Sequence, residues 1–145
     1  MTDAVTTLHE LLRNLAEQQG EPLGVLIVDH GSRRQESNDL LLELVELFRN
    51  LTGMPRVEPA HMELAAPTIA QAFDRLVAAG ARRVVVLPFF LAPGRHWSED
   101  IPRLAAEAAA KHVGVRWQVA APMGASAAVV QVLASRLVES LRGPA

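Results

Sequence analysis

Hydrophobic and polar residues change their spacing several times along the chain, and each change marks a predicted element. Short runs of β-branched and apolar residues predict strands, and apolar residues at a spacing of three to four predict helices between them. The run at Arg83–Phe90 is almost continuously apolar, which is typical of a strand buried on both faces. The expected strands are Leu23–Asp29, Arg56–Leu64, Arg83–Phe90 and Val115–Ala120, and the expected helices are Thr6–Gln19, Ser37–Leu51, Pro67–Ala79, Ser98–His112 and Ala125–Leu141.

Strands that alternate with helices predict an α/β fold in which a four-stranded parallel sheet is flanked by helices in three layers. The first and third strands are the most apolar, so we place them in the centre of the sheet. Pro59 lacks the N–H that a ladder needs, which predicts an edge position for the second strand. The expected strand order is therefore 2-1-3-4.

Two of the predicted helices have apolar faces that need a covering surface. The helix at Ser37–Leu51 has Ser37 placed as its N-cap. The first helix ends at Gly20 and lies outside the alternating pattern, so we expect a helical extension at residues 1–22 and an α/β domain at residues 23–145. Its stripe needs a partner surface in the same subunit or in another one. The apolar face of the helix at Ser37–Leu51 consists of Leu40, Leu41, Leu44, Leu47, Phe48 and Leu51. The stripe of the first helix consists of Leu8, Leu11, Leu12 and Leu15.

Composition narrows the class of protein. The 145 residues include 14 basic and 16 acidic side chains, and this net charge of −2 argues against nucleic-acid binding driven by charge. The absence of cysteine excludes disulfides, thiolate metal sites and cysteine nucleophiles. No apolar run approaches the roughly 18 residues of a membrane helix, and the N-terminus lacks the features of a signal peptide. We therefore expect a cytoplasmic protein that binds neither nucleic acid nor membrane.

The predicted strand order reverses direction between the first and third strands, and ligands of α/β proteins bind at such a point. His30 and His96 follow these two strands, each close to a glycine and an arginine. Two imidazoles would make an open, labile site for a divalent metal ion; solvated loop histidines are the alternative. Arg33, Arg34 and Arg95 suit an anionic ligand, and simple surface charge is their alternative.

Other chemistries are less well supported by the residues. The chain contains neither Gly-x-Gly-x-x-Gly nor Gly-x-x-x-x-Gly-Lys-Ser/Thr, the two glycine-rich signatures of nucleotide binding. Two alternatives stay open: a flavin or phosphate held by a loop, and phosphoryl transfer with His30 as nucleophile. Glu63 lies two positions after His61, so both would share one face of a strand, and an exposed edge pair is the alternative. His9 and His112 fall on predicted helices, where we expect surface residues.

Two motifs taken together resemble the sirohydrochlorin chelatase family, the CbiX/SirB-type class II chelatases, in its short single-unit form. The first motif is Asp-His-Gly-Ser-Arg-Arg at residues 29–34, followed by Glu-Ser-Asn at 36–38. The second is Leu-Pro-Phe-Phe-Leu at 87–91, followed by Gly-Arg-His at 94–96 and Asp-Ile-Pro at 100–102. The resemblance covers roughly residues 23–136 and implies a chelatase-like fold.

The resemblance also implies an activity, the ATP-independent insertion of Co²⁺ or Fe²⁺ into sirohydrochlorin, in sirohaem or cobalamin biosynthesis. His30 and His96 would bind the metal and take part in its insertion, and Glu63 would assist them. The divalent metal is then a substrate, and no permanently bound cofactor is expected. The tetrapyrrole carboxylates would contact Ser32, Arg33, Arg34 and Arg95.

The same resemblance leads to an expected assembly. Longer members of the family look like two fused copies of this unit with the tetrapyrrole between them, so we expect a homodimer. A non-enzymatic metal or tetrapyrrole carrier on the same fold is the alternative to an enzyme, because a fold does not determine a function.

Overall fold

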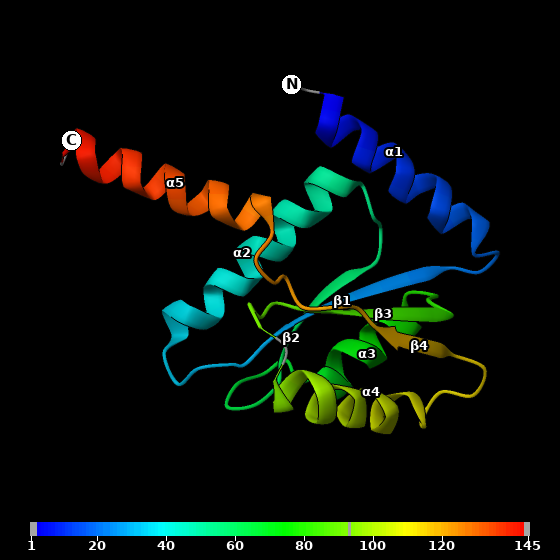
Figure 1. Ribbon diagram of the computed structural model, residues 1–145. Coiled ribbons are helices and arrows are strands. Elements are labelled where there is room, and N and C mark those ends of the chain that lie inside the picture. The colour runs from blue at the N-terminus through cyan, green and yellow to red at the C-terminus, as the bar shows by residue number, and fades with distance from the viewer. Residues whose placement is uncertain (1–2, 93, 144–145) are drawn as a thin grey trace.

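Four parallel strands form the middle layer of the computed structural model, which describes residues 3–92 and 94–143 (Figure 1). They are β1 (Leu23–Asp29), β2 (Val57–His61), β3 (Arg83–Pro88) and β4 (Arg116–Val119). The order is β2-β1-β3-β4, which confirms the predicted topology, and Pro59 lies on the edge strand as expected. The later three strands are shorter than the apolar runs that predicted them, because the last residues of each run form loops at the edge of the sheet.

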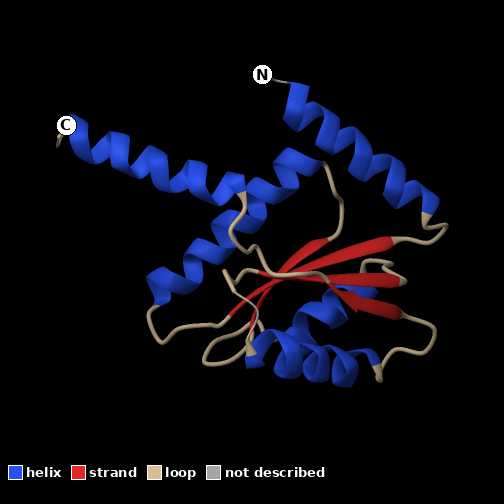
Figure 2. Ribbon diagram, in the orientation of Figure 1, coloured by secondary structure: helices blue, strands red, loops and turns tan. Residues whose placement is uncertain are grey.

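Helices lie on both faces of this sheet (Figure 2). The helices α3 (Ile69–Ala78) and α4 (Ile101–Ala109) cover one face, and a single π-helical turn, η1 (His96–Asp100), leads into α4. On the other side lie α1 (Asp3–Gln18), α2 (Gln35–Thr52) and α5 (Ala127–Arg142). The predicted N-terminal helix is therefore present, although the proposed boundary after residue 22 remains a prediction.

The start of α2 differs from the expected one. Arg34, not Ser37, is the N-cap, and its carbonyl already accepts the N–H groups of Ser37 and Asn38. The helix begins early because the preceding loop is tied to Asn38, as described below. Ser37 therefore lies inside the first turn, and the predicted serine cap was wrong.

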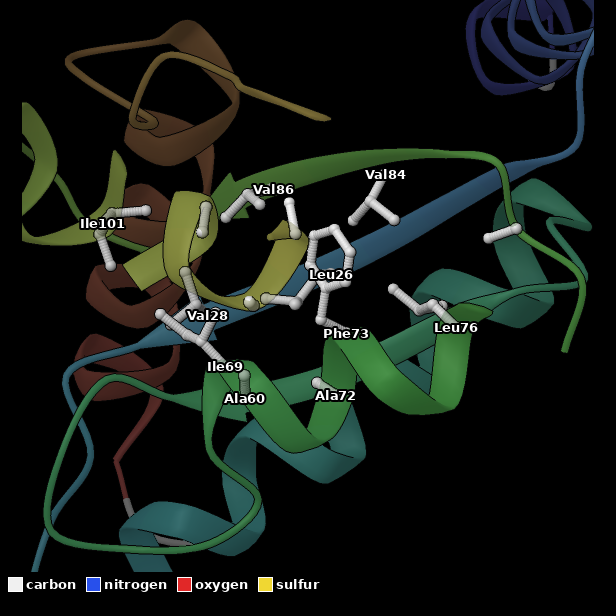
Figure 3. Packing of buried hydrophobic residues seen from close by; sticks show 14 of the residues in the cluster. Leu26, Val28, Ala60, Ile69, Ala72, Phe73, Leu76, Val84, Val86 and Ile101 are labelled. Carbon is white, nitrogen blue, oxygen red and sulfur yellow. The ribbon is translucent and has the colours of Figure 1, made fainter. Parts of the chain in front are cut away.

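The main core lies between the sheet and the pair α3 and α4 (Figure 3). Phe73 of α3 is fully buried and packs with Leu26, Val84 and Val86 from the two central strands. Burying a side chain of this size stabilises the folded chain by roughly 1.5–3 kcal/mol. The Thr68 side chain and Gln71 form a reciprocal capping box that sets the start of α3.

The opposite face of the sheet is only partly covered within one chain. Along β3, residues Val84 and Val86 are buried while Val85 and Leu87 are not, so the expected burial on both faces was wrong. The predicted apolar face of α2 divides in the same way, since Leu41 is buried but Leu47 is 63% exposed. The physical reason is that α2 packs over β1 and β2, with Val25, Ile27 and Val57 in that smaller core.

The two terminal helices contribute little to either core. The helix α1 contacts α2 and borders, with the sheet, an open cavity of about 340 Å³ next to Leu12 and Leu15. Gly20 follows it in the left-handed region (φ 72°), in agreement with its predicted role. All residues of α5 are described, and none of them is buried. Among the described residues, no helix is long and apolar enough to cross a membrane.

Candidate functional site

The carboxyl ends of β1, β2 and β3 are joined by backbone hydrogen bonds that continue past the strands. The N–H of Phe89 donates to the carbonyl of Val28 at 2.7 Å, so the loop after β3 starts beside β1. On the other side, the N–H groups of Met62 and Glu63 donate to the carbonyls of Asp29 (2.8 Å) and His30 (3.1 Å). The predicted site position Glu63 therefore lies directly beside the His30 backbone.

His30 follows β1 with its side chain exposed at this edge of the sheet. Its imidazole stacks on the largely buried ring of Phe90, with ring centroids 4.2 Å apart and an interplanar angle of 25°. The phenyl ring supports one face of the imidazole and limits how the ring can turn. This contact was missed in the sequence, where Phe90 reads as one more apolar strand residue.

Gly31 turns the chain at the point where the loop touches Glu63. Its φ is +87°, and a Cβ atom added there would lie 1.9 Å from the carbonyl oxygen of Glu63. Only glycine combines this backbone angle with so close an approach. The glycine of the first motif thus allows the loops after β1 and β2 to touch.

Ser32 and Asn38 lock the rest of the loop onto α2. The amide of Asn38, 5% exposed, accepts the N–H of Ser32 at 2.9 Å and donates to its carbonyl at 2.8 Å. The Ser32 hydroxyl accepts the N–H of Arg34 at 3.0 Å. Ser32 thus has a structural role, and contact with a substrate stays a prediction for it. Asn38 was missed as a site residue because an asparagine inside a helix gives no sign of its partner.

His61 and Asp29 form a pair beneath this loop. The Nδ1 atom of His61 lies 2.6 Å from Oδ1 of Asp29, and the His61 residue is only 1% exposed. The alternative of an exposed edge pair with Glu63 was therefore wrong. The strand β2 ends at His61 and the chain turns away, with Leu64 at a φ of 70°, so Glu63 is exposed and does not share a strand face with it.

Arginines surround the edge with their side chains in solvent. Arg33 and Arg34 are exposed at the start of α2. Arg95 is exposed beside η1, with its Nε atom 3.8 Å from a carboxylate oxygen of Glu99. An ion pair this exposed contributes little to stability, so both groups can exchange it for a ligand.

His96 begins η1, in the loop that follows β3. Its backbone therefore lies in the predicted segment, while its side chain and that of Trp97 fall outside the described residues. The proposed approach of His96 to His30 remains a prediction. Among the described residues, no group of three or more histidine and carboxylate side chains is placed to hold a metal ion.

The two remaining histidines lie away from the site. His9 lies beside Gly53, at the far end of α2. His112 is not a simple surface residue as expected, because its Nε2 lies 2.7 Å from Asp74 and its ring stacks on Phe73. It joins the turn after α4 to α3, and the surface expectation failed because sequence spacing does not show this pairing.

This architecture defines an α/β domain of the chelatase-like class, with a four-stranded parallel sheet whose switch point lies at a histidine loop. The family model of CbiX matches residues 24–140, and the chain belongs to this family. The predicted family resemblance is thereby confirmed.

Named relatives extend this assignment. The chain is 52% identical over 122 residues to the chloroplastic sirohydrochlorin ferrochelatase of Arabidopsis thaliana, covering 84% of this chain and 54% of that one. It is 32% identical over 119 residues to the sirohydrochlorin cobaltochelatase of Sulfurisphaera tokodaii, covering 82% and 94%. The cobalt complex of the sirohydrochlorin chelatase SirB from Bacillus subtilis subspecies spizizenii matches with a TM-score of 0.76 at 29% identity, covering 81% and 50%. The chain thus spans about half of the Arabidopsis and Bacillus proteins.

Proposed function

We propose that this protein is a sirohydrochlorin chelatase, a lyase that inserts Fe²⁺ or Co²⁺ into sirohydrochlorin without ATP. The observation that carries the proposal is the 52% identity to a relative named sirohydrochlorin ferrochelatase over 84% of the chain. The pathway served would be sirohaem or cobalamin biosynthesis, as the family resemblance implies.

The proposed metal path starts at the His30 imidazole. Neutral imidazole is a good ligand for divalent iron and cobalt, and a site with few protein ligands releases its ion easily. His30 and His96 would replace water on the incoming metal, and the ion would then pass to the ring nitrogens of the macrocycle. The contact between His30 and Phe90 supports this role, because it holds the imidazole at the edge of the sheet.

Insertion also releases two protons from the pyrrole nitrogens, and in this proposal Glu63 accepts one of them. Its backbone is hydrogen-bonded to His30, and its side chain is exposed at the same edge. A carboxylate within reach of the departing proton can act as general base. In this proposal His30, His96 and Glu63 are the catalytic residues.

The tetrapyrrole would be held by its carboxylates. Arginine binds carboxylate through two parallel hydrogen bonds, and Arg33, Arg34 and Arg95 are all exposed around the edge. Arginine provides only hydrogen-bond donors and cannot ligate a metal ion. Changing Arg33 or Arg95 to alanine should therefore weaken binding of sirohydrochlorin, measured by its absorbance, more than binding of Co²⁺. Equal losses for both ligands would contradict the assignment.

The decisive experiment mixes the protein, sirohydrochlorin and Co²⁺ or Fe²⁺ and follows the absorbance of the macrocycle. A chelatase converts many equivalents of substrate for each chain, and the rate is proportional to protein concentration. A change that stops at one equivalent would instead identify a metal or tetrapyrrole carrier and overturn the proposal. Running both metals shows which is inserted faster.

We also propose that the working form is a homodimer in which α5 of each chain packs on the other. The helix is amphipathic yet has no buried residue, and Leu133 is 65% exposed. An apolar groove of about 440 Å³ lies open between α2 and the sheet, lined by Leu47, Leu87 and Phe89. Exposed apolar surfaces of this kind mark contact sites.

The path of the chain supports a second copy as the occupant of this groove. The segment before α5 is fixed by hydrogen bonds from Met123 and Gly124 to the carbonyls of Phe90 and Leu91 (2.9 and 2.7 Å). It sends α5 across α2 and away from the sheet (Figure 1). A second copy would also close the strand edge into a cleft, and two-fold pairing is the commonest assembly.

The absence of cysteine allows a direct test of this contact. A chain carrying Leu47→Cys is mixed with a size-tagged chain carrying Leu137→Cys and then oxidised, so that every disulfide formed joins two chains. The proposal expects the mixed disulfide to exceed that formed with a Val113→Cys control, a fully exposed loop position. A mixed yield no higher than this control contradicts the α5 contact.

The cytoplasmic location inferred from composition is a separate proposal, which cell fractionation would test. The test is needed because the Arabidopsis relative is named as chloroplastic.

A further inference from the structure

The buried pair of Asp29 and His61 lies at the junction of the two loops that carry His30 and Glu63. The two residues are partners in the parallel ladder, at its last position before the strands end. His61 is almost completely buried, and its Nδ1 atom lies 2.6 Å from Oδ1 of Asp29. The His61 side chain therefore cannot itself reach a metal or a macrocycle at the surface. Neither residue was assigned a role in the site by the sequence.

One oxygen atom connects three parts of the backbone. Oδ1 of Asp29 accepts the Nδ1–H of His61 and also the N–H of Gly31 at 3.0 Å. A carboxylate oxygen has lone pairs for both donors, and the shared acceptor ties β2 to the turn that follows β1. Because Gly31 follows His30 directly, we expect a displacement of the Asp29 carboxylate to shift the His30 backbone, and with it the position of the exposed imidazole.

The His61 backbone fixes the other loop. Its N–H donates to the carbonyl of Pro67 at 2.8 Å, which closes the segment containing Glu63 back onto the strand. The carbonyl oxygen of Glu63 lies against Gly31, and the Glu63 N–H is bonded to His30. The side chain of His61 and the backbone around it thus hold both candidate site residues.

We propose that Asp29 and His61 are positioning residues that keep His30 and Glu63 at a fixed separation for metal transfer. The inference rests on the proposed chelatase function for its kinetic consequences, but the geometric claim is independent of it. Groups that orient metal ligands from behind typically change affinity or activity by 10- to 100-fold when they are removed.

The test compares two substitutions at one position. Asparagine places an amide N–H close to where Nδ1–H lies, so His61→Asn keeps the donor, while His61→Leu removes it and keeps most of the volume. We expect His61→Leu to lower kcat by at least about tenfold, with the KM for sirohydrochlorin nearly unchanged, and His61→Asn to recover most of this loss. Val57→Ala, at a buried position of β2 remote from the loops, controls for lost stability and should retain kcat.

A second readout does not need turnover. Hydrogen exchange of the Gly31 and Glu63 amides should be faster in His61→Leu than in His61→Asn, because only the leucine variant frees the Asp29 carboxylate. If the unsubstituted protein shows no chelatase activity, the proposed function fails, while the exchange comparison still tests positioning. If His61→Leu does not fold, Asp29→Ala, which removes the shared acceptor oxygen, is measured in its place and should show the same two effects.

Two results would overturn the inference. One is a folded His61→Leu or Asp29→Ala variant with unchanged kcat and unchanged amide exchange. The other is a His61→Asn variant as impaired as His61→Leu at equal thermal stability, which would show that the hydrogen bond to Asp29 is not what matters.

Discussion

Single residues at the carboxyl edge of the sheet separate into those that would touch the ligands and those that hold them. His30, Glu63 and the exposed arginines belong to the first set, and Gly31 and the Asp29–His61 pair belong to the second. The distinction makes different predictions for substitutions only one or two positions apart.

Removing the His30 imidazole should abolish most of the activity and leave the fold intact. The side chain is exposed and stacks on Phe90, so we expect His30→Ala to leave the hydrophobic core intact. Metal insertion should fall by about two orders of magnitude or more, and His96→Ala should behave similarly. Absorbance assays with circular dichroism as a folding check measure this, with His9→Ala as the silent control. Near-normal turnover in both site variants would remove the proposed metal path.

Gly31→Ala should disturb both stability and activity. The new Cβ would collide with the Glu63 carbonyl oxygen, in addition to the cost of about 1–3 kcal/mol for a strained backbone. Gly114→Ala is the matched control, because Gly114 also has a positive φ (81°) but has open space where the Cβ would be. Denaturant unfolding measures the stability lost in each variant, and the difference between the two losses is the contribution of the collision. Equal losses of stability would contradict a tight contact at Gly31.

At the scale of elements, α2 is placed by its first turns as much as by its apolar face. Asn38→Ala would break both hydrogen bonds to Ser32 and leave buried polar groups unpaired, at a cost of roughly 1–3 kcal/mol. We expect a lower unfolding midpoint and weaker tetrapyrrole binding, since the loop carries Arg33 and Arg34. The exposed Asn50 on the same helix supplies a control, and Asn50→Ala should change neither property.

The sequence was sufficient for the order of the elements and insufficient for the pairings between them. Pro59 and the apolar ranking of the strands predicted the sheet order, because both depend on properties of single strands. The pairing of His61 with Asp29 depends on the register of two strands 32 positions apart, which no local pattern reports. Spacing showed that α2 has a broad apolar face, but it does not show which chain covers it, so Leu47 was expected to be buried and is exposed.

At the scale of the whole molecule, the uncovered face of the sheet and the outward α5 lead to the proposed dimer. Deleting residues 1–20 separates the contribution of α1, which contacts α2 and lines the cavity beside it. We expect the truncated chain to remain dimeric, because the proposed contact is made by α5. Light scattering measures this, and a fully active species of 15.7 kDa for the unsubstituted chain would contradict the dimer altogether.

The stacking of His30 on Phe90 also gives the protein an internal spectroscopic reporter. A proton held over the face of a phenyl ring experiences the ring current, so the imidazole resonances of His30 should appear upfield of those of an unstacked histidine. The chain has only five histidines, which makes these signals simple to assign by substitution. Titration with diamagnetic Zn²⁺ would then show directly, without any macrocycle present, whether an ion arrives at this ring.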